Sequence, residues 1–576
     1  MNSFLHKVTT ALHAISHVPP RALIGHAQRR YRNKTVPLRA ASYRAAVGNA
    51  AASFPDFAPG EPAQRAAAVV AVFQEAKQAK NVPDCLSGRF TFLNRTIDFG
   101  GADRIDWTVR ADEGNHQLWR WNLANFGYAC TLMEHAPEEG LAFVAALIPG
   151  FLHSADFSRS THFSETWHPY AASQRTLALT AALVRAPRRL QGTPDWHRVE
   201  GFLRWNVAFL LRNLETELGY NHLERNLSAL ALFGLSRATF PPVVADALRR
   251  NFGAVIEASF GEDGVQLERS AMYQSLSVQS LRILREVPIW SAEQSRLIGQ
   301  RLERVEEALA ALTLGDDQPV MFNDAWVGEG PATSAVLPGA LSVGFHVMRD
   351  GGYVRLASGP FIAVLDAGPI GVDMNPGHGH ADFLAIEASV GPCRLIVDPG
   401  TYSYSAGQVR DEARAWHSHN GPSVAGLAPV QFLGSFKVGR RCAATLVEAA
   451  IGADGRQSAT GRLAFAGIAV ERQVVLTPDL VFEIQDRWSA SGATCSSRFL
   501  IPAAWRVVEG DVSEGRVVLE QDGWRVELRT PDGSLSLDAG RWSRRYNVWE
   551  EATALVLAPR PGLDRAGLRI TVLGAA

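Results

Sequence analysis

"GEGPATSAVLPGALSVG", residues 328–344, marks the point at which the pattern of apolar residues changes. Before this stretch apolar residues recur at helical spacing, and after it they alternate with polar residues in short runs bounded by turn signals. Helices followed by strands, with no helical pattern between the strands, predict two separate structural parts. We place the boundary near residue 335, within about ten residues.

The region from 61 to 335 is predicted to be one helical domain. Leu203, Val207 and Leu210 share one helical face, and similar faces recur along the region. Breaks such as "LGYN" and "GEDG" are short, and short connections favour antiparallel helix pairs. A succession of such pairs predicts a solenoid or a toroid.

The region from 336 to 576 is predicted to be an antiparallel β-sandwich. Trp524, Val526 and Leu528 alternate with charged residues, and the turn pair Asp522-Gly523 precedes them. Several strands of this kind with turn punctuation are typical of a sandwich.

Length and composition narrow the class of protein. The 576 residues exceed the roughly 250–300 at which a single core usually divides. Lys and Arg number 57 against 58 for Asp and Glu, so the overall charge favours neither nucleic acid nor a membrane as the main partner. No cysteine belongs to a CxxC pair, so we expect buried free thiols rather than disulfides or a thiolate metal site; the cysteines are Cys85, Cys130, Cys393, Cys442 and Cys495.

Residues 1–60 are predicted to form a basic helical extension. They contain no continuous apolar stretch followed by a small-residue cleavage site, so no cleavable signal peptide is expected, and no run in the chain is long enough to span a membrane. The expected compartment is therefore the cytoplasm or the periplasm. Because the segment is basic and mildly amphipathic, a peripheral membrane or partner contact and a plain surface helix both stay open.

Two histidines stand close together in "NPGHGHADFLAIEAS", which begins at Asn375. A strand starting near Gly377 would point His378 and His380 to the same side. Asp398 and His419 follow at later predicted strand ends, and two imidazoles with one carboxylate suit zinc better than calcium or magnesium. The alternative is a hydrogen-bonded polar cluster without a metal.

The helical region holds a second group of polar residues. Asn221 and His222 begin a predicted helix in "LGYNHLERN", and Tyr273 enters another after "DGVQLERSAM". On local grounds Asn221 could be a helix cap, and His222 and Tyr273 could be packed residues.

Six stretches resemble segments of the heparinase II/III-like polysaccharide lyases. Two of them depart from the family pattern: Trp121 and Ala124 replace its Tyr and His, and Gly421-Pro422 interrupts its AHNTV run. The stretches, in order, are LWRWNLANFGY (118–128), WHPYAASQR (167–175), NHLERNLSALALFG (221–234), DGVQLERSAMY (263–273), GHGHADFLAIEASVGPCRLIVDPGTYSY (377–404) and HSHNGPSVAG (417–426).

The resemblance implies a fold and a reaction. The fold is an α/α toroid, an incomplete barrel of helical hairpins, followed by an antiparallel β-sandwich. The reaction is β-elimination in an anionic polysaccharide containing uronic acid, such as a glycosaminoglycan, alginate or an exopolysaccharide. The resemblance also implies catalytic roles for Asn221, His222, Tyr273 and His378. It implies that a structural Zn²⁺ is bound by His380, Asp398 and His419.

We further expect cations and aromatic rings to contact the polymer, because guanidinium groups pair with carboxylate or sulfate and rings stack on sugars. Structural ion pairs and core packing are the alternatives for the same residues. The candidates for substrate binding are Trp119, Trp121, Trp167, Arg175, Arg225, Arg269, Tyr402 and Arg414.

Two other functions stay open. A glycoside hydrolase on the same toroid would need paired carboxylates, for which Glu268 and Asp324 are the candidates. A non-catalytic glycan-binding component of exopolysaccharide assembly would keep the fold without turnover. The sequence also leaves open which uronate is bound and whether the chain forms a homodimer.

Overall fold

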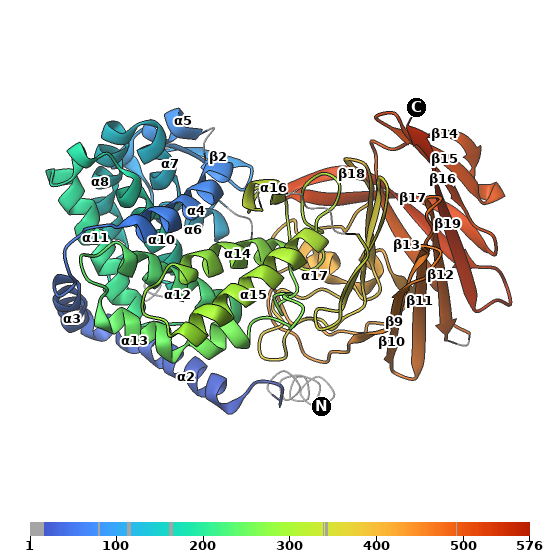
Figure 1. The fold of residues 1–576 in the computed structure, drawn as a ribbon, viewed down its shortest axis with the longest axis horizontal. Helices are drawn as coiled ribbons and strands as arrows, with labels where there is room; N and C mark the ends of the chain where they lie inside the picture. The colour runs from blue at the N-terminus through green and yellow to red at the C-terminus, as the bar shows by residue number, and fades with distance from the viewer. Residues whose placement is uncertain are drawn as a thin grey trace.

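The computed structural model describes residues 16–575 apart from 79–80, 112–113, 115–116, 160–164, 338, 340–343 and 491. Its N-terminal part consists of helices and its C-terminal part of antiparallel sheets, and the two lie side by side along the long axis (Figure 1). This confirms the predicted fold class. The helices form an incomplete ring and do not close into a barrel.

The helical part begins with α2 (Pro20–Thr35), which runs along its lower edge (Figure 1). The central helix is α10 (Pro169–Arg185), whose Ala, Leu and Thr side chains are nearly all buried. The other helices are η1 (Pro37–Arg39), α3 (Ala40–Ala52), α4 (Glu61–Gln78), α5 (Val82–Leu86), η3 (Ala102–Arg104), α6 (Leu118–Ala124), α7 (Tyr128–His135), α8 (Pro137–Ser154), η4 (Arg188–Leu190), α11 (Pro194–Leu211), α12 (Tyr220–Leu235), α13 (Pro242–Arg250), η5 (Gly253–Glu257), α14 (Ala271–Arg285), α15 (Ala292–Ala311) and α16 (Thr333–Val336).

Local sequence explains where several helices start and which face they bury. Ser291 and Gln294 form a capping box at the start of α15, and the Ser270 hydroxyl accepts from the Tyr273 backbone at the start of α14. On α12, Leu223, Leu227 and Leu230 are buried, as their spacing predicts. Tyr273 therefore projects from the first turn of a helix whose entry is fixed by its cap.

A short two-stranded sheet, β1 (Arg89–Phe92) and β2 (Arg95–Asp98), belongs to the helical part. The C-terminal part has three antiparallel sheets, ordered β3-β4-β5-β6-β7, β17-β18-β13-β8 and β14-β15-β16-β19-β12-β11-β10-β9. The bounds are β3 (His346–Met348), β4 (Tyr353–Ser358), β5 (Phe361–Asp366), β6 (Ile386–Val390), β7 (Cys393–Ile396), β8 (Pro422–Val424), β9 (Ala444–Ile451), β10 (Gln457–Phe465), β11 (Ile468–Leu476), β12 (Val481–Ser489), β13 (Cys495–Pro502), β14 (Arg506–Asp511), β15 (Arg516–Gln521), β16 (Trp524–Arg529), β17 (Gly533–Arg545), β18 (Val548–Pro559) and β19 (Arg565–Ala575), with the helices α17 (Gln408–Arg414), η6 (Trp416–Ser418) and η7 (Val512–Glu514) between strands.

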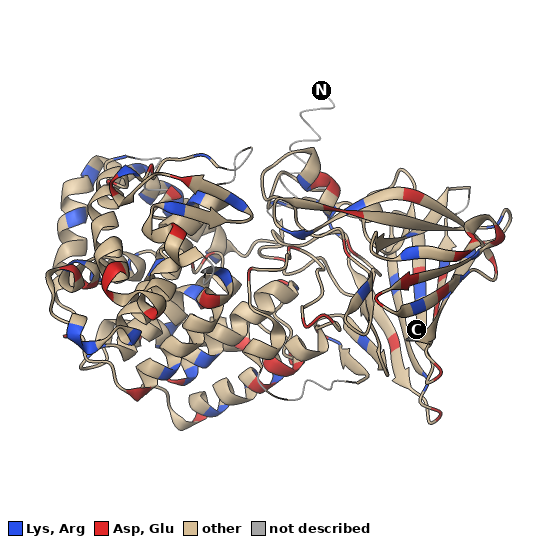
Figure 2. Ribbon diagram, turned by 90° about the horizontal axis from the view of Figure 1, so that it is seen from above, with Lys and Arg blue, Asp and Glu red and all other residues tan. Residues whose placement is uncertain are grey.

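The largest hydrophobic cluster fills the helical part and extends to Leu500 and Trp542 of the sheets, a second lies within the sheets, and a third, smaller cluster also spans both parts. That cluster combines Leu312 and Phe322, which follow α15, with Tyr353 and Val364 of the first sheet. Charges of both signs are interspersed over both parts (Figure 2). None of the helices among the described residues is both long and apolar enough to cross a membrane.

The segment around the two histidines differs from the prediction. Residues 377–385 are turns and loop rather than a strand, and β6 starts only at Ile386. Its backbone bonds run to distant segments: Asp324 N donates to His378 O, and Ala381 N donates to Arg414 O. Leu384 has a left-handed φ of 60°. Long-range bonds and a left-handed residue replace the ladder that the alternation suggested.

Candidate active site

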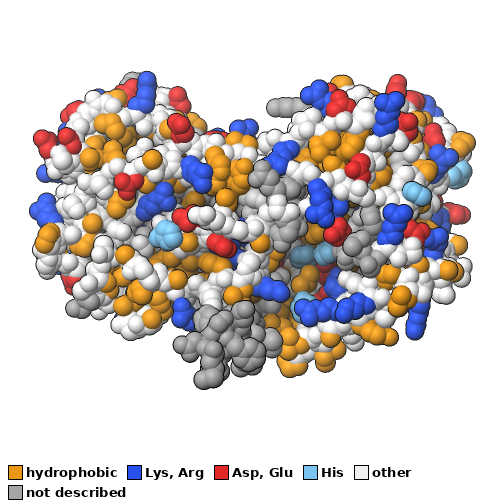
Figure 3. Space-filling model, turned by 180° about the vertical axis from the view of Figure 1, so that it is seen from behind, with side chains coloured by type: hydrophobic (Ala, Val, Ile, Leu, Met, Phe, Trp, Pro, Cys, Tyr) orange, Lys and Arg blue, Asp and Glu red, His pale blue; other side chains and the backbone are white. Residues whose placement is uncertain are grey.

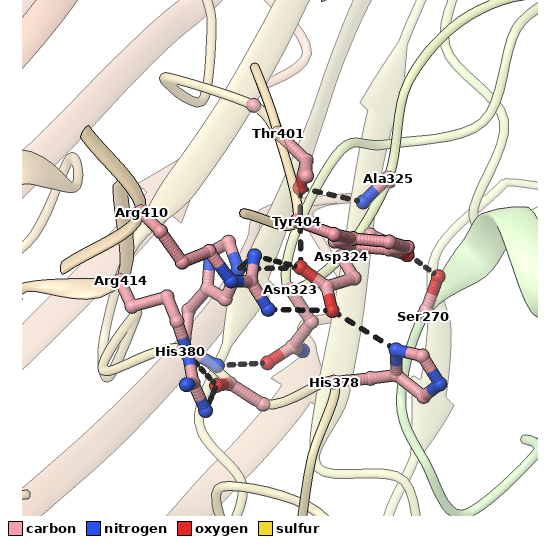
Figure 4. Close-up of polar contacts among 12 residues, drawn as sticks. Ser270, Asn323, Asp324, Ala325, His378, His380, Thr401, Tyr404, Arg410 and Arg414 are labelled. Atoms are coloured by element: carbon pink, nitrogen blue, oxygen red, sulfur yellow. Dashed lines mark hydrogen bonds and ion pairs between the residues drawn. The ribbon is translucent and has the colours of Figure 1, made fainter. Parts of the chain in front are cut away.

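One buried carboxylate lies between the two histidines. Asp324 Oδ2 is 2.9 Å from His378 Nδ1, and its Oδ1 is 3.0 Å from His380 Nε2. Arg410 binds both oxygens of this carboxylate, and the Thr401 hydroxyl donates to Oδ1 at 3.3 Å (Figure 4). The two imidazoles thus share an anchor on the segment that follows α15, not a strand face.

The charge of this carboxylate is fixed by its neighbours. Burial alone would raise the pKa of Asp324, but Arg410 and the hydrogen bonds from His378 and His380 outweigh burial and hold that pKa well below its usual range. Burial lowers the pKa of His380 to about 4, so its imidazole is neutral. A neutral imidazole is the form that a metal ion binds.

The loop that carries the histidines is held by arginine and asparagine. Arg414 donates to the Gly379 carbonyl from two nitrogens, at 3.1 and 3.0 Å, and the Asn323 side chain accepts from His380 N at 2.8 Å (Figure 4). Gly379 has no room for a side chain, since an added Cβ would lie 1.9 Å from the Ile370 carbonyl oxygen. Tight packing on both sides explains how a loop keeps His378 in place.

Tyr273 lies against His378. Their ring centroids are 4.5 Å apart, and the Tyr273 hydroxyl is 3.3 Å from that of Tyr404. Burial and the nearby Tyr170 raise the pKa of Tyr273 well above its usual range. The phenol is therefore protonated at neutral pH and can donate a proton.

Asn221 is fixed by a carboxylate on the neighbouring segment. Its Nδ2 donates to Glu268 Oε2 at 2.6 Å and its backbone N donates to the same atom at 3.1 Å. The N-cap residue of α12 is Gly219, so the alternative that Asn221 serves as the helix cap does not hold. Asn221 Oδ1 is buried and has no hydrogen-bond partner among the described residues.

His222 is anchored in the same manner. Its Nδ1 lies 3.0 Å from Glu215 Oε1, and its ring packs against Tyr170 at a centroid distance of 4.9 Å. Burial would lower the pKa of His222, but Glu215 outweighs burial and raises it. His222 and His378 thus each have Nδ1 held by a carboxylate, which leaves Nε2 as the nitrogen that can face a ligand.

A pocket opens beside these residues. Aromatic rings and amides predominate in its lining, together with the ion pair between Lys77 and Glu329. Histidine side chains also reach the surface near the centre of the face seen from behind (Figure 3). The lining consists of Gln74, Lys77, Leu118, Trp121, Asn122, Asn125, Gly127, Tyr170, Gln174, Met272, Tyr273, Trp326, Glu329 and Tyr404.

The predicted metal ligands do come together. His380, Asp398 and His419 each offer a ligand atom within 4.8 Å of the others, and all three are buried. His380 Nδ1 and His419 Nε2 have no hydrogen-bond partner among the described residues. Burial, with Asp366 nearby, raises the pKa of Asp382 to about 8 beside this group. Unpartnered imidazole nitrogens among crowded carboxylates fit a divalent cation, and the donor set is one that zinc uses.

None of the four predicted substrate-binding arginines lines the pocket. Arg175, Arg225, Arg269 and Arg414 are buried and donate to protein groups: Arg175 to Asn206 and the Ala124 carbonyl, Arg225 to Gln279 and the Leu276 carbonyl, Arg269 to Asp366 and the Gly351 and Pro369 carbonyls, and Arg414 to the Gly379, Gly434 and Ser435 carbonyls. Their guanidinium groups thus donate to backbone carbonyls, to side-chain amides and, for Arg269, to a buried carboxylate. The geometry therefore favours the alternative that these arginines are structural.

The aromatic candidates divide in the same way. Trp119 and Trp167 are in the core, and their indole N–H groups donate to the Arg95 and Ala155 carbonyls. Tyr402 stacks on Trp549 with centroids 4.6 Å apart and is not part of the pocket lining. Trp121 does line the pocket. It stacks on His168, whose pKa burial lowers to about 4.

Several residues of the site carried no signal in the sequence. Arg410 and Glu215 lie outside the six family-like stretches, and Tyr404 ends one of them but is not among the predicted site residues. Glu268 and Asp324, the carboxylates considered for a hydrolase, bond to Asn221, Gln266, Arg410 and the two histidines. Both carboxylates serve as anchors for other side chains.

Comparison with known proteins agrees with the fold. The family model described as "Heparinase II/III-like, C-terminal" matches residues 341–571. A solved heparan sulfate lyase HepC mutant from Pedobacter heparinus is 16% identical, with a TM-score of 0.57 over 95% of this chain and 91% of that chain. A solved heparinase III is 15% identical, with a TM-score of 0.63 over 90% of this chain and 86% of that chain. No curated protein matches the chain.

Proposed function

We propose that this chain is a polysaccharide lyase acting on a polymer that contains uronic acid, on the premise that its residues 341–571 match the heparinase II/III-like family model. The observation that carries the proposal is the contact between His378 and Tyr273, with centroids 4.5 Å apart beside the pocket. It brings a potential base and a protonated phenol together, one from each structural part.

The reaction starts at the proton on C5 of the uronate. That proton is weakly acidic, and its removal places negative charge on the adjacent carboxylate, so uncharged donors that face this group stabilise the transition state. Asn221 is suited to this role because Glu268 holds its amide in one orientation while the side chain itself stays neutral. Glu268 acts as the residue that positions it.

Tyr273 is the proposed general acid. With a pKa raised well above its usual range, its hydroxyl carries a proton that it can donate to the leaving O4. The sugar ring keeps its carbon and oxygen atoms: C5 loses a proton, the electron pair forms the C4–C5 double bond, and the C4–O4 bond breaks as O4 is protonated.

Two imidazoles are proposed as bases for the C5 proton. His378 stands beside Tyr273, and His222 stands beside Tyr170 on the helical part. His378 would remove a C5 proton that lies on the same face of the sugar as the leaving oxygen. His222 would remove a C5 proton on the opposite face. The configuration at C5 of the substrate therefore decides which histidine acts.

The proposed zinc ligands would stabilise the loop that carries the proposed base. His380, Asp398 and His419 would hold Zn²⁺, which balances the negative charge of the buried carboxylates and ties the histidine loop to the segments around Asp398 and His419. Asp324 binds both His380 and His378, so the protein itself connects the metal group to the proposed base.

The polymer is proposed to be an anionic polysaccharide, because one solved neighbour is named a heparan sulfate lyase and another heparinase III. Trp121 offers a ring, and Asn122, Asn125 and Gln174 offer amides for hydroxyl groups. Alginate and exopolysaccharides stay within the proposed substrate class. The cytoplasm or periplasm and a homodimer stay predictions for the compartment and the assembly.

The test is an assay of the purified protein on heparan sulfate, heparin, hyaluronan, chondroitin, alginate and a bacterial exopolysaccharide. A lyase generates an unsaturated uronyl end that absorbs in the ultraviolet, and Tyr273→Phe and His378→Ala should lower this rate by at least about 100-fold. His417→Ala is the matched control, because His417 is exposed and pairs only with Glu412.

Other results would point elsewhere. New reducing ends without ultraviolet absorbance would replace the lyase by a glycoside hydrolase. Binding of a polymer without either product would replace it by a non-catalytic glycan-binding protein. An ultraviolet product that persists in Tyr273→Phe would remove this tyrosine from catalysis.

A further inference from the structure

Helix α2 presents an apolar ridge to solvent. Its inner side is buried against the helical part through Ala22 and is followed by the buried Val36. On the opposite side Ile24, Ala27 and Tyr31 follow one another at spacings of three and four residues, so they form one line along the helix. Ile24 is 58% exposed and Tyr31 66% exposed. A surface helix normally turns its apolar residues to the core and its polar residues to solvent, whereas this line turns apolar residues to solvent.

Exposed apolar side chains are concentrated here. Of the sixteen large apolar side chains that are exposed in the described part of the chain, four lie between residues 23 and 38. The most exposed of all is Leu38, at 84%, in the short η1 helix that follows α2. Scattered exposed apolar residues need no explanation, but a cluster marks an interaction site.

Cations flank the ridge. Residues 16–39 contain no Asp or Glu, although the whole chain has almost equal numbers of acidic and basic residues. Arg30 and Lys34 lie on one side of Tyr31, and Arg21 lies on the other side of Ile24. Within the described residues, neither these three nor Arg39 forms an ion pair, and all four are exposed.

We propose that this face of α2, defined by Ile24, Ala27, Tyr31, Arg21, Arg30 and Lys34, docks the protein on an anionic lipid bilayer. An apolar line between unpaired cations matches an interfacial helix, whose apolar side chains enter the acyl boundary while its cations meet lipid phosphates. Charge complementarity selects the occupant: a second copy of this chain would bring the same cations opposite one another, and a purely polar glycan would leave Ile24 and Tyr31 without a partner.

The position of α2 is compatible with docking. The helix forms the lower edge of the helical part, with its neighbours on one side only (Figure 1). It is tied to the body by Arg29, which bonds to Glu217 from the inner side. The outer face can therefore meet a flat surface without any rearrangement of the fold.

The test uses the full-length protein and sedimentation with large vesicles. One set contains equal parts of phosphatidylglycerol and phosphatidylcholine, and the other contains phosphatidylcholine alone. The protein should bind the anionic vesicles at least about tenfold more strongly, since each cation near the surface contributes about fivefold. Raising the salt from about 0.1 M to about 0.5 M should weaken this binding.

A matched pair of variants isolates the helix. Ile24→Asp with Arg30→Glu should lower vesicle binding by about tenfold or more. Val507→Asp with Arg506→Glu introduces the same change in charge and polarity on the exposed strand β14 and should leave binding unchanged. Both variants should melt like the parent protein, because the four substituted side chains are exposed.

Four outcomes would overturn the proposal. The first is equal binding of the two vesicle types or none. The second is anionic-vesicle binding that persists in the Ile24→Asp, Arg30→Glu variant. The third is a dimer in analytical ultracentrifugation that this variant dissociates, which would assign the ridge to a second copy. Retention on a heparin column through the same cations, without binding to vesicles, would assign the face to a polyanion instead.

Discussion

Oε1 of Glu215 lies 3.0 Å from Nδ1 of His222 inside the helical part, where the Glu215 side chain is fully buried and that of His222 is 21% exposed. The second carboxylate oxygen accepts from Asn226 at 3.0 Å, and Arg29 of helix α2 is 3.8 Å from the first. Burial would raise the pKa of Glu215, but His222 and the nearby His168 outweigh it and lower that pKa to about 2. An ionised carboxylate thus holds His222 with Nδ1 protonated and Nε2 free.

Replacing this carboxylate tests whether His222 takes part in proton transfer. Glu215→Gln should lower kcat/KM by about tenfold to hundredfold, because the imidazolium formed on accepting a proton loses its counter-charge. Since Glu215 raises the pKa of His222, the acid limb of the pH profile should move to lower pH in the variant. Glu217→Gln is the control: Glu217 lies in the same segment and bonds to Arg29. An unshifted acid limb would show that Glu215 is only structural.

Asp324→Asn should damage both stability and activity. The substitution leaves the buried guanidinium of Arg410 without its counter-charge, which typically costs about 3–5 kcal/mol of unfolding free energy. It also releases His378 and His380 from a common anchor. Thermal melting and lyase assays measure the two effects. Asp373→Asn, at an exposed carboxylate that pairs with Arg441, should change neither, and a stable, active Asp324→Asn variant would refute the anchoring role.

Metal analysis tests the buried histidine pair. The purified protein should contain about one zinc per chain, and His380→Ala or His419→Ala should lose it and melt at a lower temperature. His417→Ala removes an exposed imidazole two residues away and should keep both metal and melting temperature. Wild-type metal content in His380→Ala would exclude that residue as a ligand.

A buried acid on α12 should make stability depend on pH. Burial raises the pKa of Glu224 to about 7, and Ser277 donates to it at 2.9 Å. Because this pKa is raised in the folded protein, Glu224 contributes fully to the free energy of unfolding below its pKa in the unfolded chain, about 4.3. That contribution is lost as the pH rises through about 7. Glu224→Gln keeps a neutral side chain, so its gain over the wild type should grow from near zero at pH 4 to about 3 kcal/mol at pH 8.

Melting curves of both proteins across this pH range provide the measurement. Glu303→Gln, at an exposed position on α15, is the control and should follow the wild type throughout. A constant difference between wild type and Glu224→Gln at all pH values would show that Glu224 does not titrate in the folded protein.

The order of helices and strands could be predicted from periodicity because burial repeats along each element. Leu223, Leu227 and Leu230 are buried on α12, and Val526 and Leu528 are buried on β16. The loop at 377–385 could not be predicted in this way. Its alternating residues resemble a strand, but its backbone bonds are made with Asp324 and Arg414, and no local pattern records such distant partners.

The same reason separates the predicted from the unpredicted part of the site. Motifs with several fixed residues predicted His378, Tyr273 and Asn221 as site residues. Tyr273 lines the pocket, His378 packs against Tyr273, and Asn221 bonds to Glu268. The carboxylates that hold the two histidines lie at different distances from them in the sequence: Glu215 is seven residues from His222, and Asp324 is fifty-four residues from His378. An anchor acts through space, so its position in the chain carries no signal about its partner.

The segment from Gly315 to Val327 makes the helical part and the C-terminal part depend on each other in evolution. It leaves the helical part, yet its side chains and backbone bond to the C-terminal part: Met321 N to Glu387 of β6, Asn323 N to Asp382 of the histidine loop, and Asp324 to Arg410 of α17. A gene duplication or fusion that copied only the sheets would transmit His378 and the metal group but not Asp324 or Tyr273. Neither half is a transferable module, and the chemistry can be passed on only by a chain that keeps both halves and the segment that joins them.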